Sequence, residues 1–313
     1  MHATPVRAQQ SYRHEAFLWH EKADFTAGLV PFITDGLDSG EPVMVALVPE
    51  HTAWVQDALG ARSAEATFVD MAELGLNPAR IIPAWQTFLD LHAHDGQPVR
   101  GIGGPIWPGR RREELLECQL HEALLNVAVD PEVPFWLICP YDAENLDSGV
   151  VEEAHRSHPV LVEADSYSGS GKYGGRPHVD SLFSTTLEEP ATVPIELTFD
   201  PADIGALEER VAAELMASGL AAEQAAHLAM ATHRLAVCSL NRGAAVGRVR
   251  LWRQPHAFIC EVFDDTVVPD LLLGRRVPFG EEHDGLWLAN QVCDLVQLRS
   301  TTSGTTVRVH AWQ

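Results

Sequence analysis

The segment 111–128 carries ionisable side chains at a spacing that could form a binding site. At about 100° per residue on a helix, one arc collects Glu114, Glu117, Cys118 and His121. Glu117 and His121 are four residues apart, so their side chains can touch. Leu125 shares this arc, which indicates that the polar face is covered or lines a pocket. A separate stripe predicts the core face of the helix: Leu116, Leu120, Ala123, Leu124 and Val127.

Further polar residues of the first half could complete this site, namely His14, Tyr141, Asp142 and His158. With Glu117, Cys118 and His121 of the 111–128 helix, they predict a cluster that binds a small ligand. The ligand-binding candidates are therefore His14, Glu117, Cys118, His121, Tyr141, Asp142 and His158.

Plainer interpretations of the same residues stay open. A Glu–His pair at helical spacing is often exposed, and Cys118 and Cys139 suit small buried positions. His158, which precedes a proline, could simply bond to backbone. A metal site of Cys, His and Glu residues is conceivable, but no diagnostic spacing supports it, so no metal is assigned.

A glycine-led helix in the second half is another candidate for chemistry. Gly285-Leu286 opens a short apolar segment, and a strand follows almost at once over 295–299. A helix start of this kind points backbone N–H groups at phosphate in nucleotide-binding folds.

Alternating apolar runs and helical patterns over residues 11–163 predict an α/β domain. Short continuous apolar runs, typical of buried parallel strands, lie at 42–48, 67–69, 99–102 and 135–139. Helices are expected near 22–38, 50–59, 78–95, 111–128 and 147–156.

The pattern changes after residue 163. Residues 164–194 include a Ser/Gly-rich stretch that predicts a linker or mobile loop. From 195 to 313 the expected order is helix, helix, hairpin, loop, helix, hairpin, which predicts an α+β sandwich with helices on one face of an antiparallel sheet. The hairpin strands are expected at 249–253 with 257–263 and at 295–299 with 305–311.

Length and composition favour a two-domain globular protein of 313 residues. A formal net charge of −22 argues against a nucleic-acid surface, which needs clustered Lys and Arg. No apolar run is long enough to cross a bilayer, and the first ten residues lack the core of a secretory signal. Five scattered cysteines without a C-x-x-C pair predict reduced thiols and a cytoplasmic location.

Several short motifs of the first domain carry a resemblance to a known family: YRHEA at 12–16, GPIWPGR at 104–110, ECQLHEALLN at 117–126, CPYD at 139–142 and RSHP at 156–159. Residues 11–163 resemble the MEDS sensory domain, named from methanogen and methylotroph regulators. The resemblance implies a RecA-like layered sheet that senses a small molecule. No phosphate-binding loop follows the 42–48 strand, so nucleotide hydrolysis is not expected in this domain.

The segment LWLANQVCDLV at 286–296 and the order of elements around it carry a second resemblance. Residues 195–313 resemble the histidine-kinase-type ATPase fold in its anti-sigma-factor serine-kinase branch. The resemblance implies ATP and Mg²⁺ as ligands. Asp264 would read the adenine amino group, and Gly285 and Leu286 would belong to a lid over the phosphates.

The residues that this family uses for catalysis are replaced. Arg234 stands where a Glu acts as the general base, and a guanidinium stays protonated in proteins. Cys238 replaces an Asn that helps to hold Mg²⁺, and a thiol is a poor ligand for this hard cation. Thr266, His283 and Asp284 stand where glycines are usual. We therefore expect no catalytic residues here.

Together these features predict a cytosolic signalling regulator. A small ligand would bind the first domain and change how the second binds a sigma factor or an anti-sigma-factor antagonist, without kinase turnover. The alternative is an active ATP-dependent serine kinase that phosphorylates such an antagonist, and a third hypothesis is a metal-dependent enzyme in the first half. Neither nucleic acid nor a membrane is expected as a partner, and the oligomeric state is left open, a homodimer included.

Overall fold

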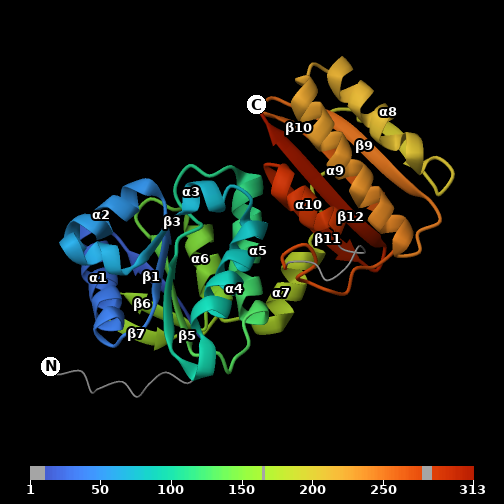
Figure 1. Cartoon of the computed structure of the whole chain (residues 1–313). Helices are drawn as coiled ribbons and strands as arrows, with labels where there is room; N and C mark the ends of the chain where they lie inside the picture. The colour runs from blue at the N-terminus through green and yellow to red at the C-terminus, as the bar shows by residue number, and fades with distance from the viewer. Residues whose placement is uncertain (1–10, 164–165, 277–283) are drawn as a thin grey trace. The chain divides into compact units, whose positions relative to one another are not determined.

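The computed structural model describes residues 11–163, 166–276 and 284–313, and the chain divides into two compact units, Met1–Val179 and Asp180–Gln313. Figure 1 shows each unit built around its own sheet. His283, which was expected in a lid, lies outside the described residues. The described chain contains no helix with the length and apolar character needed to cross a membrane.

The first unit is built on a seven-stranded sheet with the order β3-β2-β4-β5-β1-β6-β7. All neighbours pair in parallel except β7, which is antiparallel to β6. The strands are β1 (Arg13–Trp19), β2 (Val43–Leu47), β3 (Thr67–Asp70), β4 (Val99–Gly103), β5 (Phe135–Asp142), β6 (Val160–Glu163) and β7 (Ser166–Gly169). The predicted α/β class with a mainly parallel sheet is confirmed for this unit.

Helices cover both faces of this sheet. The helices before the boundary between the units are α1 (Lys22–Asp38), α2 (Pro49–Leu59), α3 (Met71–Leu74), α4 (Ile81–His92), α5 (Arg112–Ala128) and α6 (Ser148–Ser157), with 3-10 turns at Gly60–Glu65, Pro78–Arg80 and His94–Gly96. Helix α7 (Gly175–Ser184) runs across the boundary. Phe25 and Leu29 of α1 pack with Phe17, Val45 and Ile138 on one face. Because side chains alternate along a strand, His14 and Cys139 point to the other face, where α5 lies.

The burial of α5 differs from the expected stripe. Leu116, predicted to be core, is 38% exposed, whereas Glu117, Cys118 and His121 are at most 1% exposed. Leu120, Ala123 and Leu124 of the expected stripe are buried as predicted, and Leu125 is buried as well, so the polar arc is covered in addition to the stripe. The helix turns these polar groups inward because they meet polar partners, which the spacing alone does not show.

Residues 164–194, expected to be a linker, contain two regular elements. Strand β7 extends the sheet beside β6, and the hydroxyl of Tyr167 donates to Glu15 at 2.7 Å. Helix α7 follows, and its His178 contacts Glu153 of α6. Backbone pairing and polar contacts order a segment that is poor in apolar residues.

The second unit is a five-stranded antiparallel sheet with the order β11-β12-β10-β9-β8. Its elements are β8 (Ile195–Phe199), α8 (Ile204–Ala217), α9 (Ala222–Asn241), β9 (Gly247–Gln254), β10 (Ala257–Asp264), α10 (Asp284–Val292), β11 (Leu295–Thr301) and β12 (Gly304–Trp312). Helices α8, α9 and α10 lie on one face of this sheet (Figure 1). The predicted α+β arrangement is present, with β8 as an additional edge strand.

Candidate functional site

A buried polar cluster lies between the sheet of the first unit and helices α5 and α6. It consists of His14 on β1, Cys139 on β5, Glu122 on α5 and His158, which directly follows α6. Strands β1 and β5 are neighbours with Ala16 opposite Cys139, so His14 and Cys139 stand on the same face of the sheet. All four side chains are at most 2% exposed.

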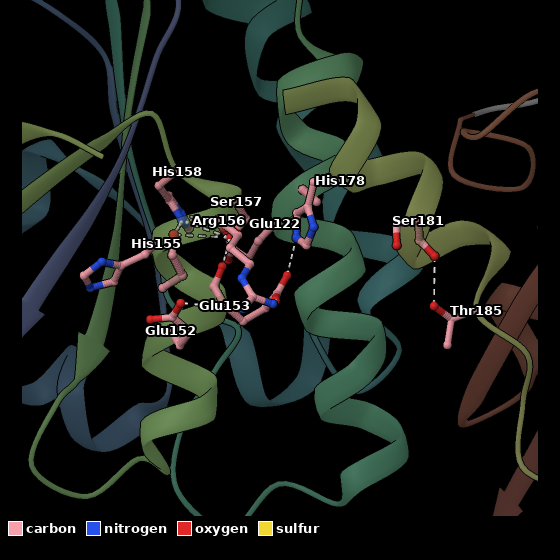
Figure 2. A network of polar contacts seen from close by, with 12 residues as sticks. Glu122, Glu152, Glu153, His155, Arg156, Ser157, His158, His178, Ser181 and Thr185 are labelled. Carbon is pink, nitrogen blue, oxygen red and sulfur yellow. Dashed lines mark hydrogen bonds and ion pairs between the residues drawn. The ribbon is translucent and has the colours of Figure 1, made fainter. Parts of the chain in front are cut away.

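The polar atoms of the cluster converge on a single point. His14 Nε2 lies 3.1 Å from Glu122 Oε2 and 3.3 Å from Cys139 Sγ. His158 Nε2 lies 3.2 Å from the same Glu122 oxygen. Figure 2 shows the side chains of His158 and Glu122. One ligand atom from each of the four residues falls within 4.8 Å of the others.

Neighbouring groups determine where each imidazole carries its proton. The Nδ2 of Asn126 donates to the Ser157 carbonyl at 2.7 Å, so the amide oxygen must face His14 Nδ1, 3.2 Å away. His14 Nδ1 is therefore a donor, and in the neutral ring Nε2 carries an accepting lone pair. The Nδ1 of His158 likewise donates to the Ala154 carbonyl at 2.9 Å, which leaves its Nε2 as an acceptor.

With these tautomers the Cys139 thiol, 3.3 Å from His14 Nε2, is the one donor that the four cluster residues direct at each other, and the remaining groups are acceptors. Two imidazole lone pairs face one carboxylate, and Glu122 Oε1 and His158 Nε2 are buried without a hydrogen-bond partner. Burial and the nearby His158 lower the pKa of His14 to about 4. Burial opposes ionisation of Glu122, but the two histidines outweigh it and hold the pKa of this carboxyl well below its usual range.

Cys139 remains a thiol in the absence of a cation. Burial, together with the negative charge of Glu122, raises the pKa of Cys139 well above its ordinary value. The four groups can hold a metal ion, because two imidazoles, a thiolate and a carboxylate form a donor set that Zn²⁺ uses.

The structure brings together only some of the predicted ligand residues. His14 and His158 belong to the cluster, and the ring of Tyr141 meets His158 edge-on at 5.6 Å between centroids. Cys118 donates instead to the Pro105 carbonyl at 3.3 Å. The remaining predicted residues lie apart from it: Glu117 and His121 are buried elsewhere on α5, and Asp142 is the last residue of β5.

Two residues of the cluster, Glu122 and Cys139, and the neighbouring Asn126 were not selected from the sequence. Glu122 and Asn126 are four residues apart on α5, a spacing that places both on one helical face. Cys139 was interpreted as a small apolar residue. The signal that could have identified Cys139 is its place two residues before Tyr141 on the same strand, since alternate residues share a face.

A separate cleft of about 630 Å³ opens at the carboxyl ends of the parallel strands. Trp19 ends β1, Pro49 follows β2 and Asp142 ends β5, while Trp54 of α2 and Trp107 after β4 also line the cleft. Small molecules bind at this edge in open α/β sheets. The volume lies within the range of about 300–1,000 Å³ that is usual for ligand pockets.

Aromatic rings form the wall of this cleft and charged groups form its rim. His51 packs against Trp54 and Trp19 at centroid distances of 4.8 and 5.5 Å, and burial lowers the pKa of His51. Lys22 Nζ lies 5.2 Å from the Trp54 ring. Asp142 accepts from the backbone N–H of Asn145 at 3.0 Å, so its carboxylate also shapes the turn. The cleft suits a small ligand with an apolar body and a polar group.

The predicted nucleotide residues of the second unit are engaged by the chain itself. Asp264, 2% exposed, accepts from Ser239 Oγ at 2.6 Å and from Arg242 at 2.5 Å through one oxygen. Its other oxygen accepts from Thr266, whose backbone N–H lies at 2.8 Å. Both carboxylate oxygens therefore already have donors.

Gly285 and Leu286 pack α10 against α9. A Cβ on Gly285 would lie 2.5 Å from the Arg234 carbonyl oxygen and 2.7 Å from Cys238 Sγ. The cavity beside them measures about 140 Å³ and is lined by Leu286, Cys238 and other mainly apolar side chains. This volume is smaller than the range of about 300–1,000 Å³ that is usual for ligand pockets.

Residues 13–159 match the family model of the MEDS domain, described as the methanogen/methylotroph DcmR sensory domain. The matched range contains all four cluster residues and the residues that line the cleft. No curated protein matches the chain. The match supports a MEDS-type sensory domain over residues 13–159, which suggests a signalling regulator.

Proposed function

We propose that this chain is a signalling regulator whose MEDS unit binds a small molecule in the cleft at the carboxyl ends of β1, β2 and β5. The cleft carries this proposal, because its volume of about 630 Å³ and its aromatic wall with a charged rim suit a small organic ligand. The match of the unit to a sensory domain supports the same function.

The second unit would be the output, binding a sigma factor or an anti-sigma-factor antagonist. Its order of elements, an antiparallel sheet covered by helices on one face, is compatible with the histidine-kinase-type ATPase fold that the sequence resembles. Ligand binding in the first unit would change the affinity of the second for its partner, which requires two states with different ligand affinities.

The output would operate without kinase turnover. Arg234 is exposed and cationic at the position of the expected general base. Asp264, which would read adenine, is saturated by Ser239, Arg242 and Thr266. These contacts favour protein binding over phosphoryl transfer as the role of the second unit.

Ligand binding is tested by thermal unfolding of the full chain with a panel of short-chain alcohols, amines and carboxylic acids. A molecule present at a hundredfold excess over its Kd should raise the Tm of the first unit by roughly 5–10 °C. His51→Ala removes part of the aromatic wall and should abolish the shift. His94→Ala, the same substitution at an exposed position outside the cleft, should retain it. A shift that persists in His51→Ala would place the ligand elsewhere.

Coupling and catalysis are tested with the stabilising molecule in hand. The affinity for a sigma factor or antagonist should change about fivefold or more when the cleft is occupied. Incubation with radiolabelled ATP, Mg²⁺ and the antagonist should leave the antagonist unlabelled. Equal affinity in both states would refute the coupling, and labelling of an antagonist serine would establish the kinase instead.

A further inference from the structure

We propose that His14, Glu122, Cys139 and His158 form a structural site for a divalent transition-metal ion, with Zn²⁺ as the best fit. The site lies toward the amino-terminal end of β1, whereas the ligand cleft begins at Trp19, where this strand ends. The inference does not depend on the proposed sensory function, because it rests only on the four side chains and their hydrogen-bond partners.

The spacing of the donor atoms fits tetrahedral coordination. Zn–N and Zn–O bonds of about 2.0–2.2 Å and a Zn–S bond of about 2.3 Å give edges of roughly 3.3–3.8 Å between ligands. The separations of 3.1, 3.3 and 3.2 Å around His14 Nε2 and Glu122 Oε2 lie at or slightly below the lower end of this range, and all four donor atoms lie within 4.8 Å of one another. A small outward movement of the side chains would place a metal ion between them.

The charges of the site also match a divalent cation. Glu122 contributes one negative charge, and Cys139 contributes a second when its thiol proton leaves to solvent on metal binding. Together they neutralise a 2+ ion in a region where an uncompensated charge is costly. A soft thiolate with two imidazoles favours Zn²⁺ over Mg²⁺ or Ca²⁺, which prefer oxygen ligands.

Second-sphere contacts orient the two imidazoles for metal binding. Asn126 holds His14 through Nδ1, and the Ala154 carbonyl holds His158 through Nδ1, so both Nε2 lone pairs point at the same centre. Metal-binding histidines usually donate their other ring N–H in this way. The buried Glu122 Oε1 and His158 Nε2, which lack hydrogen-bond partners, show that protein donors do not satisfy the cluster.

Four protein ligands with no more than 2% exposure describe a closed site. Closed four-coordinate sites are structural, whereas catalytic zinc keeps a position for water or substrate. The ion would connect β1, β5, α5 and the end of α6 in one linkage. This arrangement favours stabilisation of the first unit over metal-dependent catalysis.

The test uses the full chain, purified without a histidine tag. Elemental analysis should find about one zinc per chain. After metal is removed with a chelator under denaturing conditions and the chain is refolded, Co²⁺ should bind with the same stoichiometry and give a thiolate-to-cobalt charge-transfer band. Cys139→Ser should lose this band. Cys118→Ser, which changes another buried thiol of the same unit, should retain both the band and the stoichiometry.

The orienting residue gives a separate readout. Asn126→Ala should weaken metal affinity by about 10–100-fold while the charge-transfer band remains, because the ligands themselves are intact. Zn²⁺ should raise the Tm of the refolded chain, and Cys139→Ser should reduce this gain. Absence of stoichiometric binding to the folded chain, or a charge-transfer band that survives in Cys139→Ser, would overturn the proposal. Cys139→Ser preserves the shape of the side chain, so the loss of the band in this variant reports the loss of the thiolate ligand.

Discussion

His310 on β12 is a single residue through which pH acts on the second unit. Its side chain is 1% exposed, and its Nε2 lies 3.0 Å from Gln297 Oε1. Burial and the positive charge of Arg308 lower the pKa of His310 from 6.5 to about 3. The unfolded chain therefore binds a proton below about pH 6.5 that the folded chain refuses until about pH 3, so the free energy of unfolding must fall as the pH decreases through this window.

Replacement of this histidine should remove that part of the pH dependence. Between about pH 6 and pH 4, the free energy of unfolding of His310→Gln should fall by about 1.4 kcal/mol less per pH unit than that of the unaltered chain. Urea unfolding at a series of pH values measures this difference. The matched control is His256→Gln at an exposed hairpin position, which should follow the unaltered chain. If the free energy of unfolding of His310→Gln and of the unaltered chain depended on pH in the same way, folding would not lower the pKa of His310.

Residue types alone identified part of the buried cluster of the first unit. His14 and His158 were selected because imidazoles are versatile ligands, although 144 positions separate them in the sequence. Glu122 was missed because the helical face was assigned from Glu117 and His121, and only the sheet packed against α5 shows which arc meets β1. Cys139 was missed because it stands in an apolar strand segment, where the sequence does not show that its thiol contacts His14. Convergence of four elements is a tertiary property that spacing along the chain does not encode.

Local signals located most of the elements. A helix was predicted near 78–95, and the side chain of Asn77 caps its start by accepting from the Ala79 N–H at 3.1 Å, although the first turn is 3-10 and α4 begins at Ile81. Strand β1 was not predicted, because RHEAFLW begins with charged residues whose partners are distant in sequence, such as Tyr167 for Glu15. The edge strand β7 was missed for the same reason: strand pairing, rather than composition, orders it.

The close approach of α10 to α9 depends on the absence of a side chain at Gly285. A Cβ there would overlap the Arg234 carbonyl oxygen, which is backbone and cannot rotate away. We expect Gly285→Ala to push the helices apart and to lower the free energy of unfolding by about 1–3 kcal/mol, measured by chemical denaturation.

Gly205 of α8 provides the matched control for this substitution. It is also a helical glycine of the second unit, but a Cβ at Gly205 would meet nothing within 4 Å. Gly205→Ala should stabilise the unit by about 0.4–1 kcal/mol, because alanine reduces the entropy of the unfolded chain. If Gly285→Ala were as stable as Gly205→Ala, the packing of α10 on α9 would be looser than the structure shows.

At the scale of the whole molecule, the two units place their candidate site residues in different environments. The MEDS unit separates a closed polar cluster from an open cleft along the length of its parallel strands. The second unit closes its predicted nucleotide residues with contacts inside the chain. The whole chain has a formal net charge of −22. Repulsion between its negative charges therefore opposes the folded state.

That repulsion predicts how stability responds to salt. The chain has 44 acidic residues and 22 basic ones, and exposed ion pairs such as Arg62–Asp38 contribute little because solvent screens them. Raising NaCl from about 10 mM to about 150 mM shortens the Debye length from about 30 Å to about 8 Å, which screens repulsion between distant carboxylates. The Tm measured by calorimetry should therefore rise over this range, and KCl at the same ionic strength should give the same rise because screening does not depend on ion identity. A Tm that falls with added salt would mean that favourable ion pairs outweigh the net negative charge in the folded molecule.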